Sequence, residues 1–104
     1  MRILFLGDVV GISGCSKIMN NLLDQLKKNK IDFVIINGEN AAEAGVGLTK
    51  EICEDFFRCG VNVITTGNHV WDQKEIMNFI DKENRLLRPK NLFEPAPGKG
   101  FEIY

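Results

Sequence analysis

Val61-Asn62-Val63-Ile64-Thr65-Thr66-Gly67-Asn68-His69, residues 61–69, is the stretch that decides the fold. A short apolar run is followed by a glycine, an amide and the only histidine of the chain. The run has the length and composition of a buried strand. Because glycine turns the backbone at little cost, the next side chain can lie over the strand end. This stretch therefore predicts a strand that leads into a functional loop.

The same pattern occurs twice earlier in the chain. Residues 2–6 form an apolar run that leads into Gly7-Asp8, and residues 32–37 lead into Gly38-Glu39-Asn40. Unbroken apolar runs of this length are typical of parallel strands covered by other elements. Three strands with polar side chains at their carboxyl ends are therefore predicted.

Helical patterns separate the three runs. Apolar residues recur at helical spacing between positions 18 and 26, and Ser13 is a candidate N-cap for that helix. Thr49 is a candidate N-cap for a second helix, which Gly60 would end. The segment 38–48 is rich in glycine and small residues, which indicates a loop.

A third helix is predicted after His69. Asp72 and Glu75 have the spacing of a capping box. The inward residues of that helix would be Ile76, Met77 and Ile80. An extended segment is expected over residues 85–89, and residues 101–104 resemble the start of another strand.

The alternation of strands and helices predicts an α/β fold, with a mainly parallel sheet and helices on both faces. No linker divides the chain, so residues 1–104 are expected to form part of one domain. The net charge of −1 gives no basic field for nucleic acid. No apolar run approaches the roughly 20 residues of a membrane span. Three cysteines without a zinc pattern indicate reduced thiols in a cytoplasmic protein.

Five polar side chains should meet at the carboxyl edge of this sheet, where ligands of open α/β sheets bind. They are Asp8, Glu39, Asn40, Asn68 and His69. Oxygen donors with an imidazole suit manganese, iron or magnesium. Each residue taken alone is more commonly an ordinary turn residue. Convergence on one edge favours a metal site, and a bridging carboxylate can hold two ions that clamp a phosphoryl group.

These motifs resemble those of a known family. The sets Gly7-Asp8, Gly38-Glu39-Asn40 and Gly67-Asn68-His69 are similar to the first three motifs of calcineurin-like metallophosphoesterases. The segments RILFLGDVVG, INGENAAEAGVGLT and ITTGNHVWDQKEI resemble the YmdB-type family more closely, as do LLRPKN and PGKGF. The resemblance covers almost the whole chain. It implies the N-terminal portion of a four-layer α/β/β/α fold that is interrupted here.

The resemblance also implies a function, the hydrolysis of phosphodiester bonds in 2′,3′-cyclic nucleotides. It implies two divalent ions, iron or manganese or else magnesium, with Asp8, Glu39, Asn40 and Asn68 as ligands. Glu39 would bridge both ions. A metal-bound hydroxide would attack phosphorus, and His69 would donate a proton to the leaving oxygen. Arg88 and Asn91 are weaker candidates for shaping the substrate side.

One departure from the family limits these expectations. The remaining ligands of the family are histidines of a second half, and no histidine follows His69. The isolated chain is therefore expected to be inactive. The alternative function is a non-catalytic α/β module that binds metal or associates with itself as a homo-oligomer. Nucleotide binding by the loop 7–14 is disfavoured, because its glycines match neither the Rossmann nor the Walker spacing.

Overall fold

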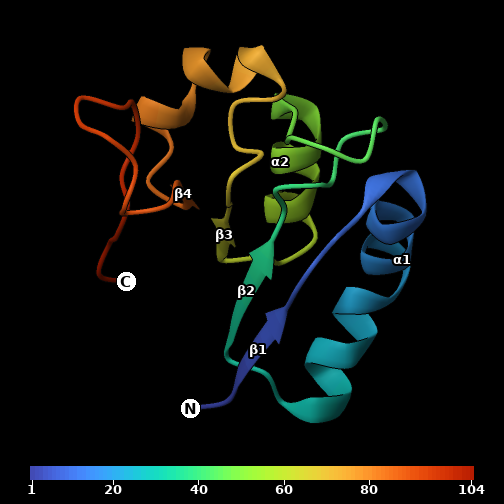
Figure 1. Cartoon of the computed structure of the whole chain (residues 1–104). Coiled ribbons are helices and arrows are strands. Elements are labelled where there is room, and N and C mark those ends of the chain that lie inside the picture. The colour runs from blue at the N-terminus through green and yellow to red at the C-terminus, as the bar shows by residue number, and fades with distance from the viewer.

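The computed structural model describes residues 1–104 and consists of one four-stranded sheet with two α-helices (Figure 1). The strands lie in the order β1-β2-β3-β4 and are all parallel. The predicted α/β fold with a mainly parallel sheet is confirmed. In chain order the elements are β1 (Ile3–Leu6), α1 (Gly11–Asn29), β2 (Phe33–Asn37), α2 (Lys50–Arg58), β3 (Val63–Thr65), the 3-10 helices η1 (Lys74–Asn78) and η2 (Ile80–Lys82), and β4 (Leu86–Leu87).

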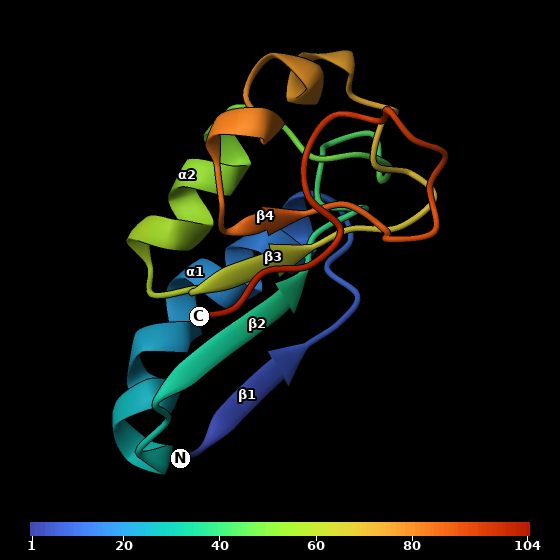
Figure 2. The same cartoon turned by 90° about the vertical axis from the view of Figure 1, so that its left-hand side faces the viewer.

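Both α-helices lie on the same face of the sheet (Figure 2). Each strand pairs with the next one along the chain, and right-handed crossovers that all advance in one direction place their helices on one side. Leu4 and Leu6 pack against the core below these helices, whereas Ile3 and Phe5 are 57% and 61% exposed on the other face. The expectation of helices on both faces is therefore wrong for this chain. It contains one sheet and one helical layer.

The start of α1 differs from the prediction. The helix begins at Gly11, with Val10 as its N-cap residue, and Ser13 lies inside the helix. No side chain caps this end. Instead the Gly11 amide donates to Asn40 O over 2.9 Å, and Val10 forms a bridge with Asn40. A contact distant in sequence thus replaces the local cap, and it ties the loop after β1 to the loop after β2.

The bounds of α2 follow the sequence signals. Thr49 accepts a hydrogen bond from the Ile52 amide over 3.3 Å, so the predicted N-cap is confirmed. Gly60 has a φ of +109°, which only glycine adopts at low cost. Phe56 is fully buried and anchors the helix to the core.

The predicted third helix does not form as one α-helix. The short 3-10 helices η1 and η2 occupy this stretch instead. The side chains of the expected capping box have other partners. Asp72 contacts the His69 ring, and Glu75 accepts the Lys50 amide over 2.7 Å. Ile76 and Ile80 are buried as predicted, whereas Met77 is 52% exposed. The extended segment at 85–89 is confirmed as β4, but residues 101–104 form no strand.

The three cysteines are free thiols within or beside the helices. Cys15 and Cys53 are buried, and Cys59 is half-buried. Burial raises the pKa of all three thiols, that of Cys53 to about 12. This is the environment of inert packing residues rather than of reactive nucleophiles.

The raised pKa values predict slow alkylation of the native chain. At pH 8 very little of the Cys53 thiol is ionised, because burial raises its pKa to about 12. We expect iodoacetamide to modify Cys53 at least about a hundredfold more slowly in the native chain than in the chain unfolded by urea. Mass spectrometry of timed aliquots measures both rates. Similar rates for the two states would contradict the buried environment of Cys53.

Candidate functional site

The carboxyl ends of the strands point toward the same edge of the sheet (Figure 2). The register continues beyond the strands themselves. The Val9 amide donates to Asn37 O over 3.1 Å, and the Gly38 amide donates to Thr65 O over 3.0 Å. The three loops that follow β1, β2 and β3 are therefore fixed side by side by backbone hydrogen bonds. These loops carry the five predicted site residues.

Asp8 and Asn40 come together from different loops. Asn40 Nδ2 donates a hydrogen bond to Asp8 Oδ2 over 3.0 Å. The other amide atom, Asn40 Oδ1, is buried and has no hydrogen-bond partner. A buried oxygen without a partner is costly, and it is a suitable ligand for a hard cation. The contact thus brings one carboxylate and one unpartnered amide oxygen into neighbouring loops.

Glu39 reaches from the loop after β2 to the loop after β3. One carboxylate oxygen, Oε2, accepts the His69 amide over 3.3 Å. A Cβ atom placed at Gly67 would lie 2.5 Å from Glu39 Cδ and would clash with both carboxylate oxygens. The Glu39 carboxylate therefore occupies the space that a side chain at residue 67 would fill, and we call this contact with Gly67 the seat of Glu39. The absence of a side chain at residue 67 lets Glu39 lie between the two loops.

The side chains of Asn68 and His69 lie in the turn after β3. Asn68 is exposed, and the side chain of His69 is 36% exposed. His69 Nδ1 lies 2.7 Å from Asp72 Oδ2. The structure thus pairs Asp8 with Asn40, and Glu39 with the His69 backbone. It shows no group of three or more histidine, cysteine or acidic side chains arranged around a metal position.

Sequence reasoning assigned no site role to Gly67 as a seat, to Asp72 or to Asn37. Asn37 Oδ1 accepts the Glu39 amide over 3.3 Å, and its Nδ2 lies 3.5 Å from Glu39 Oε1. The His69–Asp72 spacing was visible in the sequence, but the capping-box pattern accounted for Asp72 in another way. Nothing in the sequence placed Gly67 beneath Glu39, because that contact joins two different loops.

The seat at Gly67 predicts a specific effect of adding one methyl group. In Gly67→Ala, the new Cβ displaces the Glu39 carboxylate and disturbs the packing between the two loops. We expect a loss of about 1–3 kcal/mol in the free energy of unfolding, the usual cost of overpacking. Urea titration followed by circular dichroism measures this loss. Gly14→Ala is the control, since its Cβ would lie 3.1 Å from a Val9 methyl group that can move slightly. Equal stability of Gly67→Ala and wild type would contradict the seat.

Arg88, a candidate for the substrate side, points into its own loop instead. It is 4% exposed, and its guanidinium donates to Pro97 O, Pro89 O, Ala96 O and Glu94 Oε1. Asn91 is exposed. The Arg88 side chain therefore organises residues 88–99 and has its donors occupied within them.

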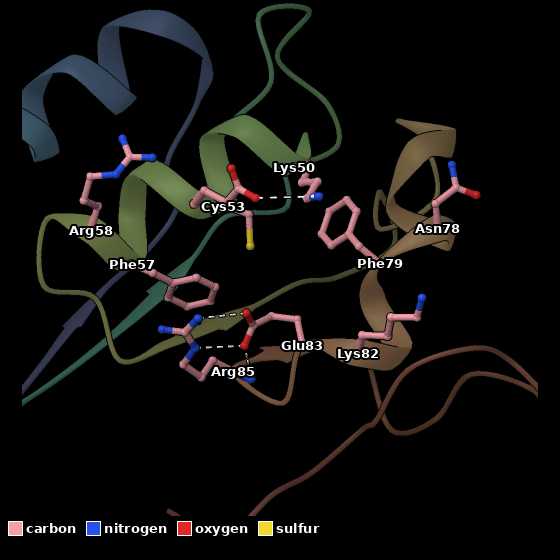
Figure 3. Close-up of a pocket in the computed structure, with 10 residues that line it drawn as sticks. Lys50, Cys53, Phe57, Arg58, Asn78, Phe79, Lys82, Glu83 and Arg85 are labelled. Carbon is pink, nitrogen blue, oxygen red and sulfur yellow. Dashed lines mark hydrogen bonds and ion pairs between the residues drawn. The ribbon is translucent and has the colours of Figure 1, made fainter.

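A cavity of about 510 Å³ lies away from the strand-end residues, between α2 and the segment of η1, η2 and β4 (Figure 3). Its charged groups are largely paired with one another. Arg85 makes two hydrogen bonds of 2.8 Å to Glu83 and covers the Phe57 ring at 3.8 Å. None of the five predicted site residues lines this cavity, so the candidate site is the sheet edge.

Known proteins with similar sequences and folds carry phosphoesterase names. A "2',3'-cyclic-nucleotide 2'-phosphodiesterase" of Bacillus subtilis is 50% identical over 101 residues, which is 97% of this chain and 38% of the relative. A crystal structure described as a novel phosphatase of Mycoplasma pneumoniae aligns with a TM-score of 0.87 and 38% identity, over 100% of this chain and 39% of that one. A hypothetical protein of Thermus thermophilus aligns equally well, over 99% and 40% of the two chains.

The names of these relatives support a hydrolase class of phosphodiesterases and phosphatases. Within that class the chain belongs to the YmdB-like protein family, whose sequence pattern matches residues 4–104. The chain spans about 38% of the length of the Bacillus relative. No helix is both long and apolar enough to cross a membrane.

Proposed function

We propose that this chain contributes one half of the active site of a cytoplasmic metal-dependent phosphodiesterase that hydrolyses 2′,3′-cyclic nucleotides. The substrate class comes from the Bacillus relative, whose name states it. Asp8, Glu39, Asn40 and Asn68 are the proposed ligands of two divalent ions, manganese or iron, with magnesium as the alternative. His69 is the proposed proton donor. The chain supplies four ligands for two ions, so further ligands have to come from elsewhere.

The observation that carries this proposal is the state of Asn40 and Glu39. Asn40 Oδ1 is buried without a partner, while Nδ2 of the same amide donates to the Asp8 carboxylate. Glu39 is held on Gly67, between the loops after β2 and β3. Asn40 Oδ1 has no protein donor, whereas each Glu39 oxygen accepts one long hydrogen bond, of 3.3 or 3.5 Å. Hard divalent ions suit oxygen atoms of this kind.

Divalent ions bound there would stabilise charge on the phosphoryl oxygens and lower the pKa of a bound water. The residues of the chain position the loops and transfer the proton. Glu39 fixes the loop after β3 through the His69 amide, so the imidazole has a defined distance from the ligand set. His69 then protonates the ribose oxygen that leaves phosphorus. Asp72 Oδ2 lies 2.7 Å from the other ring nitrogen, Nδ1.

The test joins metal binding to hydrolysis. Manganese binding is measured by calorimetry on the 104-residue chain. Hydrolysis of 2′,3′-cyclic AMP is measured on a chimera in which this chain replaces the matching stretch of the Bacillus relative. We expect an active chimera, and we expect Asn40→Ala to weaken manganese binding about 10–100-fold. Asn20→Ala, on the exposed side of α1, is the matched control. An inactive but folded chimera, or unchanged manganese binding in Asn40→Ala, would contradict the proposal.

The uncovered face of the sheet supports a second candidate function, self-association without catalysis. Ile3 and Phe5 are exposed there, and Phe101 and Ile103 are 67% and 88% exposed. Apolar surface of this kind can drive association. Analytical ultracentrifugation of the chain distinguishes the two functions when it is combined with the metal titration. A stable oligomer that binds no manganese would favour this second candidate.

A further inference from the structure

Asp72 makes one side-chain contact, and that contact is with the only histidine. Its Oδ2 atom lies 2.7 Å from His69 Nδ1. The side chains are 40% and 36% exposed, so the pair lies at the surface of the site rather than in the core. A carboxylate only accepts hydrogen bonds. The nitrogen that faces it must therefore carry the proton.

The backbone around this pair is firmly held. The Val70 amide donates to Gly67 O, and the Asp72 amide donates to His69 O, each over 3.1 Å. Val70, which lies between the two, is 1% exposed and packs in the core. Because the turn is anchored at its centre, the fold sets the backbone positions from which the two side chains meet. An exposed ion pair on a flexible segment would lack this constraint.

The following residue extends the anchoring to the loop after β2. Gln73 Nε2 donates to Val46 O over 3.1 Å, and a Cβ at Gly47 would lie 2.8 Å from the Gln73 backbone nitrogen. The loop that carries Glu39 and the turn that carries His69 are thus packed directly against each other. His69 is held from two sides, its amide by Glu39 and its ring by Asp72.

A helix-capping role does not account for Asp72. The N-cap residue of η1 is Gln73, and no side-chain hydrogen bond caps that end. The Asp72 carboxylate is directed to the imidazole instead. Two explanations of the Asp72 contact remain. Asp72 either has a structural role in the turn or determines which nitrogen of the His69 ring carries the proton.

We propose that Asp72 is the positioning residue of His69: its hydrogen bond keeps a proton on Nδ1, so that the imidazolium donates the Nε2 proton to the substrate and the ring left behind is the neutral Nδ1–H tautomer. The hydrogen bond made by one ring nitrogen determines which nitrogen carries the proton. The catalytic part of this inference rests on the proposed function. The tautomer itself is a property of the chain and is independent of metal and substrate.

The tautomer can be read directly, because the chain contains one histidine. Long-range proton–nitrogen correlation spectra of the 104-residue chain, labelled with nitrogen-15 and free of metal, give one set of ring signals. At a pH at which the ring is neutral, we expect Nδ1 to show the protonated signal. In Asp72→Ala, the population should move toward Nε2–H by about tenfold or more, since a charged acceptor is lost.

Asp24→Ala is the matched control, since it removes an exposed aspartate on α1 and should leave the ring signals unchanged. An Nε2–H tautomer in the wild-type chain would overturn the proposal, even if Asp72→Ala failed to fold. An unchanged Nδ1–H tautomer in a folded Asp72→Ala would overturn it as well. A purely structural role of Asp72 predicts that last result.

Kinetics of the chimera test the catalytic consequence separately. We expect Asp72→Ala to lower kcat about 10–100-fold with little change in KM or metal content, as for loss of a residue that orients a functional histidine. Unchanged kcat in an active chimera would overturn the positioning role. An inactive wild-type chimera would contradict the proposed function alone, because the spectra of the isolated chain still decide the tautomer.

Discussion

Replacing His69 by alanine in the chimera is expected to lower kcat for 2′,3′-cyclic AMP by about a hundredfold to ten-thousandfold. A ribose oxygen leaves phosphorus slowly unless it receives a proton as the bond breaks. His69 is the only imidazole in this chain, and Glu39 holds it beside the proposed metal ligands. Metal content should stay unchanged, because His69 is outside the proposed ligand set. Product chromatography and metal analysis measure the two quantities on the same sample.

The basicity of the leaving group provides the control for this prediction. A para-nitrophenolate ion departs without a proton, so bis-(para-nitrophenyl) phosphate has little need of a general acid. The loss in His69→Ala should therefore be at least about tenfold smaller with that substrate. Equal losses with both substrates would show that the substitution harms the site in general. Wild-type turnover of 2′,3′-cyclic AMP would remove His69 from the mechanism.

The parts of this fold that the sequence predicts well are those with local causes. Each apolar run followed by glycine became a strand with a polar loop at its carboxyl end, because the strand composition and the turn lie in neighbouring residues. Thr49 capped α2 as predicted for the same reason, since an N-cap depends on residues within one turn. The meeting of Asp8 with Asn40 then followed from the parallel direction of the strands.

The parts that the sequence did not predict depend on contacts between distant segments. The capping-box pattern at Asp72 and Glu75 is a valid local signal. In the folded chain, however, the Asp72 carboxylate contacts the His69 ring, and the Glu75 carboxylate accepts the Lys50 amide. Ser13 lost its capping role because the Asn40 carbonyl accepts the Gly11 amide. The side of the sheet on which α2 lies depends on strand order, which no single segment encodes.

The candidate site also combines features that the sequence predicts with features that depend on contacts between distant segments. The sequence supplied its donor atoms, whereas the structure adds how these atoms are held. Gly67 provides the seat for Glu39, and Asn37 contacts both the backbone and the carboxylate of Glu39. A polar side chain at a strand end is common. The buried Asn40 oxygen without a partner is unusual for a turn, and it is the observation on which the proposed site rests.

Arg88→Met is expected to lower the free energy of unfolding by about 2–4 kcal/mol. Methionine fills a similar volume but has no donors, so the carbonyl groups of Pro97, Pro89 and Ala96 lose the guanidinium as a partner, and only Pro89 O keeps another, the Leu92 amide. The hydrogen bond from Arg88 lowers the pKa of the Glu94 carboxyl, and that shift should disappear as well. For a chain of this size each kcal/mol corresponds to about 4–8 °C in Tm. Thermal unfolding followed by circular dichroism measures the change.

Arg85→Met is the matched control, because it also breaks an arginine–glutamate pair. Arg85 pairs with Glu83, but its side chain is 49% exposed, against 3% for Arg88. Exposed pairs contribute little, so the control should lose about 1 kcal/mol or less. If Arg88→Met were as stable as the control but raised KM in the chimera, Arg88 would have to reach the substrate after all. A large loss of stability with unchanged KM would instead make Arg88 the residue that folds the loop 88–99, consistent with its bonds within that loop.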